Sequence, residues 1–248
     1  MENNIQQFFE GLDNLFAGNR VSEAGEYLDT WLAESEVSGD WQLKLSVLNE
    51  RMGYGRSVED ERRGLESVFA VEELIEQYGL DKNPSIPTIW INMGTTLCHF
   101  GRVKEGMQYY EKAETVILRT DKDPYLLASL YNNKSAGLEA QKNYEGAEQA
   151  YNKALELLNN LGKEALYYKI VTYVNLANNM RLQNNQQKAD DYIRKMREIL
   201  DGEEIIRDAS YASACLKCVT YYENYGYRKE AEEMTERARN IYAGNGAV

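Results

Sequence analysis

The chain has 248 residues, with 28 Lys and Arg against 40 Asp and Glu, so its net charge at pH 7 is −12. This acidic balance argues against nucleic acid and anionic membranes as partners, because clusters of Lys and Arg supply the attraction to both. No run of 18 apolar residues and no basic, then apolar, leader is present, so we expect neither a membrane span nor a secretory signal. Three cysteines without a framework spacing fit a reducing, cytoplasmic location.

Six segments follow one another along the chain, each built around a small residue. These residues are Ala24, Gly64, Gly106, Ala147, Ala189 and Ala231, at successive spacings of 40, 42, 41, 42 and 42. Apolar residues recur 16 and 9 positions before and 4 and 7 positions after most of them. Spacings of 3, 4 and 7 are typical of amphipathic helices, so each segment predicts a pair of helices. The expected units lie near residues 5–37, 41–80, 84–121, 124–162, 164–201 and 203–243.

Short turns separate the two helices of most units, and prolines mark where later units begin. Gly and Asn in these turns tolerate the left-handed conformation that ends a helix. Pro84, Pro87 and Pro124 are interpreted as helix starts within one continuous domain rather than as domain boundaries. The predicted turns are Ala17–Asn19, Phe100–Arg102, Gln141–Asn143, Gln183–Asn185 and Tyr225–Tyr227.

The residues within each repeat follow a known pattern. The best examples are Trp90-x-x-Met93-Gly94-x-x-Leu97 followed by Gly106-x-x-x-Tyr110-x-x-Ala113, and Tyr131 and Leu138 followed by Ala147-x-x-x-Tyr151-x-x-Ala154. This pattern resembles the tetratricopeptide repeat (TPR) family. The long period is similar to that of kinesin light chain and of peptide-sensing bacterial regulators. The resemblance implies an all-α fold, a right-handed α-α superhelix of about six helical hairpins that forms a single domain over residues 1–248.

The first helix of each unit also carries a polar stripe, opposite its apolar positions, that we expect to line a concave groove. Its sharpest feature is Asn92, Asn133 and Asn175, all 14 residues before the small residue of their units. A carboxamide both donates and accepts, so three in a row can hold a peptide backbone in either direction. The resemblance supports this hypothesis, since relatives with the long period bind peptides through asparagine ladders. Chance, or hydrogen bonding between neighbouring helices, is the alternative.

Other residues near this stripe complete the predicted peptide-binding set. Lys217 and Arg181 are the cations best placed to meet a carboxylate of a ligand. The remaining members are Asn132, Asn178, Thr95, Ser129 and Thr220.

Two motifs that suggest chemistry are set aside. Cys215 and Cys218 occupy apolar positions inside a predicted helix, where a free cysteine packs as a small hydrophobe. His99, the single histidine, falls on the polar stripe and is interpreted as a contact residue. With no second histidine and no phosphate-binding glycine loop, the sequence predicts no catalytic site, no metal and no cofactor.

The predicted function is therefore a non-enzymatic module that binds a protein or peptide ligand. One alternative is the sensor half of a peptide-responsive regulator, although the repeats begin near residue 5 and no effector domain is visible. Another is a structural homo-oligomer, because Phe9 and Phe16 lie on the exposed side of the first predicted helix.

Overall fold

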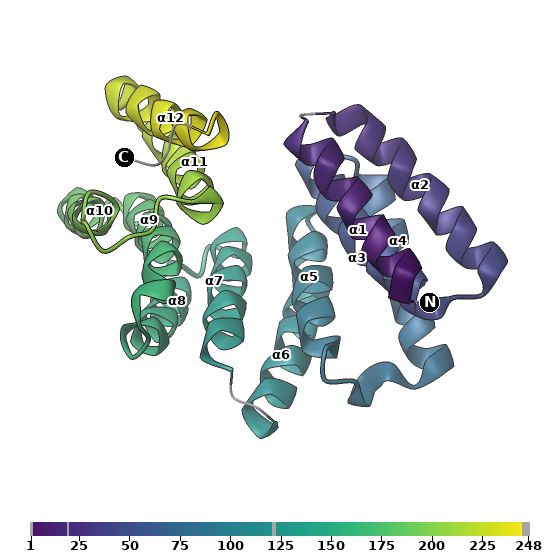
Figure 1. Cartoon of the computed structure of the whole chain (residues 1–248). Coiled ribbons are helices and arrows are strands. Elements are labelled where there is room, and N and C mark those ends of the chain that lie inside the picture. The colour runs from purple at the N-terminus through teal and green to yellow at the C-terminus, as the bar shows by residue number, and fades with distance from the viewer. Residues whose placement is uncertain (1, 19, 121–122, 245–248) are drawn as a thin grey trace. The chain divides into compact units, whose positions relative to one another are not determined.

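The structure is a computed structural model that describes residues 2–18, 20–120 and 123–244 (Figure 1). These residues form twelve α-helices and two short 3-10 helices, without a strand. Successive helices form six hairpin-like pairs, from α1 and α2 to α11 and α12, one for each predicted repeat. This arrangement confirms the all-α repeat fold. Asn19, in the first predicted turn, lies outside the described residues.

The chain divides into two compact units, Met1–Thr120 and Asp121–Val248. Unit 1 contains α1 (Glu2–Ala17), α2 (Val21–Ser38), α3 (Trp41–Ser57), α4 (Glu61–Tyr78), the 3-10 helix η1 (Leu80–Lys82), α5 (Ile86–His99) and α6 (Val103–Arg119). Unit 2 contains α7 (Pro124–Ala140), α8 (Tyr144–Asn159), the 3-10 helix η2 (Lys163–Ala165), α9 (Leu166–Leu182), α10 (Gln186–Leu200), α11 (Ala209–Asn224) and α12 (Arg228–Tyr242). A single continuous solenoid over the whole chain stays a prediction.

The helix ends have the causes that the sequence suggested. Four of the predicted turns place a residue in the left-handed region, at Gly101, Lys142, Asn184 and Gly226. Pro124 and Pro87 stand in the first turns of α7 and α5, where a missing N–H costs nothing. Several helices are also capped by a side chain: Asp40, Asp60, Asp123, Asn143, Asn185 and Asp208 each accept from backbone N–H groups of the helix that follows.

All six small residues are buried, and in unit 1 they bring two backbones into contact. A Cβ on Gly55 of α3 would lie 2.9 Å from the backbone nitrogen of Gly64 in α4. A Cβ on Gly94 of α5 would lie 2.9 Å from the carbonyl oxygen of Gly106 in α6. No side chain fits in either place, so glycine is required for this spacing of the helices.

The two cysteines of α11 are reduced and buried, as predicted. Burial raises the pKa of the Cys215 thiol to about 11 and that of Cys218 to about 12. A thiol with such a pKa is protonated at neutral pH and therefore a poor nucleophile. These residues belong to the apolar core that α9, α10, α11 and α12 share.

Candidate functional site

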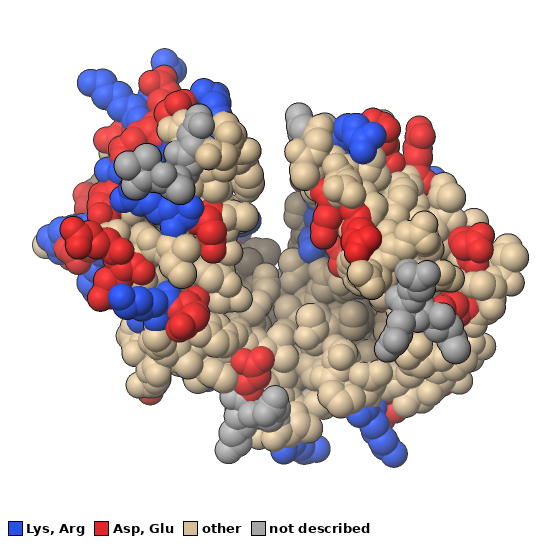
Figure 2. Space-filling model, viewed as in Figure 1, with Lys and Arg blue, Asp and Glu red and all other residues tan. Residues whose placement is uncertain are grey.

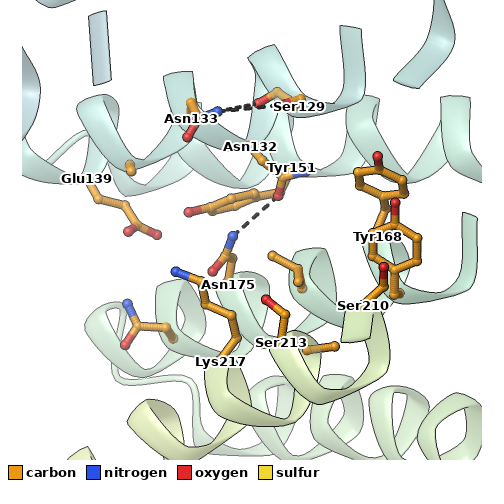
Figure 3. Close-up of a pocket in the computed structure, with 15 residues that line it drawn as sticks. Ser129, Asn132, Asn133, Glu139, Tyr151, Tyr168, Asn175, Ser210, Ser213 and Lys217 are labelled. Atoms are coloured by element: carbon orange, nitrogen blue, oxygen red, sulfur yellow. Dashed lines mark hydrogen bonds between the residues drawn. The ribbon is translucent and has the colours of Figure 1, made fainter. Parts of the chain in front are cut away.

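A pocket of about 520 Å³ opens in unit 2 between the first helices of its three repeats, α7, α9 and α11 (Figure 3). Most of its polar groups are carboxamides and hydroxyls, and its charged residues are Glu139 and Lys217. From α7 come Ser129, Asn132, Asn133, Ala136 and Glu139; from α8, Tyr151; from α9, Tyr167, Tyr168, Val171, Asn175 and Asn178; and from α11, Ser210, Ser213, Ala214 and Lys217. Apart from Ala214, which is buried in the apolar core, the pocket residues of the first helices lie outside the buried core.

The asparagines of the pocket are held by hydrogen bonds within the chain. Asn133 Nδ2 donates to the carbonyl oxygen of Ser129 at 3.0 Å, one turn earlier in α7. Asn175 Nδ2 on α9 donates to Asn132 Oδ1 on α7 at 3.3 Å, which links two successive repeats (Figure 3). Asn132 Nδ2 donates to the Ala128 carbonyl and to Thr172 Oγ1, both at 3.0 Å.

Unit 1 contains the same link between successive repeats. Asn92 Nδ2 on α5 donates to Asn49 of α3, to the carbonyl oxygen at 3.0 Å and to Oδ1 at 2.9 Å. Asn49 and Asn92 are separated by 43 residues, as are Asn132 and Asn175. Asn92 and Asn175 therefore join the first helices of neighbouring repeats, whereas Asn133 bonds only within α7. We expect the loss of Asn92 or Asn175 to remove one such link.

Glu139 lies at the end of the pocket beside Tyr151 and was not predicted from the sequence. Its Oε1 accepts from Asn179 Nδ2 on α9 at 2.9 Å, and it also forms a hydrogen bond with the Tyr151 hydroxyl. Burial raises the pKa of this carboxyl above its usual range, although both hydrogen bonds oppose the shift. Burial and the Glu139 charge together hold the pKa of Tyr151 well above 10, so its hydroxyl remains a donor.

The two predicted cations have different surroundings. Lys217 is exposed on α11, and its amino group points toward the part of the pocket that contains Glu139 and Asn175 (Figure 3). Arg181 does not line the pocket, and its side chain is only 13% exposed. Its guanidinium donates to the hydroxyls of Tyr221 and Tyr227 at 3.2 and 2.6 Å and pairs with Asp190 at 3.2 Å. The Arg181 guanidinium thus holds α9 against the last repeat and is not free to meet a ligand.

Six of the ten predicted residues line this pocket: Ser129, Asn132, Asn133, Asn175, Asn178 and Lys217. Asn92 and Thr95 belong to α5 of unit 1, and Thr220 is exposed on α11, one turn beyond Lys217. Tyr151, Tyr167 and Tyr168 were missed. Tyr151 was assigned to the core, and the other two stand at the start of α9, before the positions that the repeat pattern covers.

Outside the pocket, few features suggest chemistry. Within the described ranges, no group of three or more His, Cys, Asp and Glu residues could hold a metal ion. No helix in that same part of the chain is long and apolar enough to cross a bilayer. His99 is part-exposed and lies 3.2 Å from Glu59 through its Nε2. In unit 2, charged side chains gather over the second helices α10 and α12, where Arg197 and Arg237 both pair with Glu233 and Asp201 (Figure 2).

The helical pairs, their small-residue contacts and their long period define a helical-repeat protein. A family model described as tetratricopeptide repeat matches residues 85–160 and 126–201. The two matches together cover residues 85–201, from α5 to α10, so this part of the chain consists of tetratricopeptide repeats. The fold supports a protein–protein interaction module.

Solved structures share this fold at low sequence identity. Nearly identical TPR-like repeats of a kinesin light chain-type protein from Podosopora anserina are 17% identical, with a TM-score of 0.55 over 83% of this chain and 98% of that one. BtubC (BKLC) from P. vanneervenii is also 17% identical, with a TM-score of 0.50 over 100% of this chain and 93% of the other. A tetratricopeptide repeat protein from Parabacteroides merdae is 11% identical, with a TM-score of 0.51 over 96% and 93%. No curated protein sequence matches the chain significantly.

Proposed function

We propose that the chain is a non-enzymatic interaction module whose unit 2 pocket binds a peptide or an extended segment of a partner protein. The observation that carries the proposal is the set of carboxamides from two successive repeats, Asn132, Asn133, Asn175 and Asn178, that line one concave pocket. Carboxamides match the hydrogen-bonding groups of a peptide backbone and do not depend on the side chains of the ligand. Lys217 adds a cation that fits a carboxylate of the ligand.

The chemistry of the pocket also favours binding over catalysis. Its two ionisable groups of opposite charge, Glu139 and Lys217, are accompanied by amides, hydroxyls and aromatic rings. Glu139 is hydrogen-bonded to Asn179 and Tyr151 and so serves to fix the wall of the pocket. Tyr167 and Tyr168, whose ring centroids lie 4.1 Å apart, offer apolar area at the start of α9.

A random peptide library displayed on phage tests the proposal with the full-length chain as bait. Enriched peptides are synthesised and titrated by calorimetry into the wild type and into the double variant Asn133→Ala/Asn175→Ala. Two lost hydrogen bonds at about 0.5–1.5 kcal/mol each should weaken binding about five- to 150-fold.

The matched control is Asn160→Ala, because Asn160 is exposed at the end of α8, away from the pocket, and donates only to its own helix. This variant should bind like the wild type. If every enriched peptide binds the double variant as tightly as the wild type, the pocket is not the binding site.

Self-association through α1 is a second candidate function. Phe9 and Phe16 are large apolar side chains that are 37% and 44% exposed on this helix, and exposed apolar patches mark interaction sites. Light scattering after size-exclusion chromatography should show whether the chain forms dimers and whether Phe9→Ser/Phe16→Ser abolishes them. A wild-type chain that stays monomeric at high concentration would remove this candidate.

A further inference from the structure

The asparagines of the polar stripe share one orientation. Nδ2 of Asn92 contacts two acceptors of Asn49, and Nδ2 of Asn133 contacts the Ser129 carbonyl oxygen at 3.0 Å and Ser129 Oγ at 3.5 Å. Asn175 directs one N–H at Asn132. No described residue donates to Oδ1 of any of the three. The nitrogen of each amide thus has a partner within the chain, although Asn175 keeps a second N–H, and the oxygen of each amide has no donor among the described residues.

This orientation is fixed by the backbone. The carbonyl oxygen of Ser129 can only accept, so the group of Asn133 that faces it must be Nδ2. Likewise, the Ala128 carbonyl requires Nδ2 of Asn132, so the Asn132 oxygen faces α9 and the Asn175 group that meets it must be a donor. The Ser129 carbonyl therefore orients the Asn133 amide directly. The Ala128 carbonyl orients the Asn132 amide, which in turn orients that of Asn175.

The open oxygens are accessible to a ligand. Among the described residues, no buried side-chain nitrogen or oxygen lacks a hydrogen-bond partner. Because Oδ1 of Asn133 and Oδ1 of Asn175 have no such partner, neither oxygen is completely buried, and both residues line the pocket. The α7 and α9 sides of the pocket thus present acceptors, to which the carboxylate of Glu139 adds another.

One cation of the pocket is directed at these acceptors. Lys217 is on α11, across the pocket from Asn133, with Asn175 between them (Figure 3). Its amino group points toward Asn175 and Glu139, where it can hold a carboxylate of a ligand.

We infer that these asparagines act as hydrogen-bond acceptors and that the occupant of the unit 2 pocket is an extended peptide whose backbone N–H groups face Asn133 and Asn175. A carboxylate of the peptide faces Lys217. This inference rests on the proposed function and sharpens it, because an amide free to turn would meet either an N–H or a C=O group of the backbone. A ligand with no N–H donors at this wall would leave the two oxygens without partners.

Backbone substitution in the ligand tests the polarity. The probe is the tightest library peptide that depends on Asn133 or Asn175, with each backbone amide replaced in turn by an ester and by a thioamide. An ester removes the N–H and weakens the carbonyl as an acceptor, whereas a thioamide strengthens the N–H and weakens the acceptor. At the amide that meets Asn133, the ester should weaken binding about two- to twelvefold, and the thioamide should leave binding unchanged or tighter.

A second variant connects the effect to the residue. In Asn133→Leu the ester penalty at that amide should disappear, while in the matched variant Asn160→Leu it should persist. Asn133 bonds only within α7, so Asn133→Leu should fold, and its melting curve by circular dichroism checks this. The same pair of measurements with Asn175→Leu examines the second oxygen.

Two failures can be told apart. If no library peptide depends on Asn133 or Asn175, the proposed function falls and the polarity falls with it. If such peptides exist but thioamides weaken them wherever esters do, the asparagines contact carbonyl groups. If the ester penalty survives in both Leu variants, the N–H that the ester removes contacts another group. Either result leaves the proposed function standing and shows that only the present inference is wrong.

Discussion

Unit 1 and unit 2 are built from the same helical pairs but differ in the stripe of their first helices. Fourteen residues before the small residue, unit 1 has Glu10, Glu50 and Asn92, whereas unit 2 has Asn133, Asn175 and Lys217. Glu50 is half-buried, and burial raises the pKa of its carboxyl above the usual range. The same positions thus carry two carboxyl groups in one unit and one amine in the other.

The units also differ in how the helices of a pair meet. Unit 1 uses glycine at two of its crossings, Gly55 against Gly64 and Gly94 against Gly106. Unit 2 uses alanine at all three of its small positions, Ala147, Ala189 and Ala231, each 0 to 5% exposed. The six small positions therefore vary only between glycine and alanine, while the stripe varies in charge. Helix packing restricts the small positions to glycine and alanine, whereas the stripe positions can vary with the ligand.

The comparison can be measured because all three tryptophans, Trp31, Trp41 and Trp90, belong to unit 1. Tryptophan fluorescence therefore follows unit 1, and circular dichroism follows the helices of both units. The predictions below use this difference and run from the largest expected effect to the smallest.

A chain shortened to end at Asp201 should lose the most stability, and lose it in unit 2. Removing α11 and α12 uncovers apolar side chains of α9 in the same core, among them Ile170 and Val174. Exposing two such side chains costs about 3–6 kcal/mol, at about 1.5–3 kcal/mol each. The midpoint by circular dichroism should fall, while the fluorescence midpoint should move less. Equal shifts of both midpoints would show that the two units unfold as one.

Gly106→Ala should destabilise unit 1 by about 1–3 kcal/mol, the usual cost of overpacking. Its Cβ would lie 2.5 Å from Cys98 Sγ and 2.6 Å from the Gly94 carbonyl oxygen, so α5 and α6 must separate. Urea unfolding followed by tryptophan fluorescence measures this effect.

The matched control for this substitution is Gly53→Ala in α3, where the nearest atom to a new Cβ is the Arg56 guanidinium at 3.8 Å. With open space, the gain in helix propensity should stabilise the chain by about 0.5–1 kcal/mol. In unit 2, Ala147→Gly should cost about 1 kcal/mol. If Gly106→Ala is as harmless as Gly53→Ala, the close crossing is not required.

Asn92→Ala and Asn175→Ala should cost similar stability, about 0.5–1.5 kcal/mol each, because each removes one link between successive repeats. Their effects on binding should differ. Calorimetric titration of a pocket-dependent peptide should give a lower affinity for Asn175→Ala and an unchanged affinity for Asn92→Ala. A similar loss with Asn92→Ala would mean that the ligand also contacts unit 1.

Lys217→Ala should change stability by less than about 0.5 kcal/mol, since the side chain is exposed. It should weaken only peptides that carry a carboxylate, and the difference from the wild type should shrink as salt is added. The corresponding change in unit 1, Glu10→Ala, should leave the affinity unaltered. A loss of affinity for uncharged peptides would assign Lys217 to hydrogen bonding with the backbone.

Much of the fold could be predicted from the sequence, because a period of 40 to 42 residues fixes both the helix pairs and their buried sides. Phe8, Leu48 and Trp90, each 16 positions before a small residue, are all less than 10% exposed. Gly55 and Gly64 lower helix propensity, and the sequence alone does not explain them. Their cause is the close approach of the α3 and α4 backbones, which the pattern of a single helix does not reveal.

Less of the site could be predicted, because its partners come from neighbouring repeats. The repeat pattern identified Asn92, Asn133 and Asn175 but not their orientation, which depends on Asn49, Ser129 and Asn132. Arg181 was predicted to face a ligand, yet tyrosines of the following repeat take up its guanidinium. Side chains at equivalent positions have equivalent directions, whereas their contacts depend on what the next repeat supplies.

Each unit contains at least one cysteine whose labelling rate can report local opening. Cys98 lies in unit 1 and Cys215 and Cys218 lie in unit 2, and burial raises the pKa of Cys98 to about 11, as it does for Cys215. Cys215 and Cys218 are buried and Cys98 is part-buried, and a protonated thiol that is covered by helices reacts with a bulky reagent mainly while those helices are apart. The rate of labelling at each cysteine therefore reports how often its helices open in the native protein. Without any introduced probe, the chain records the opening rates of its two halves separately.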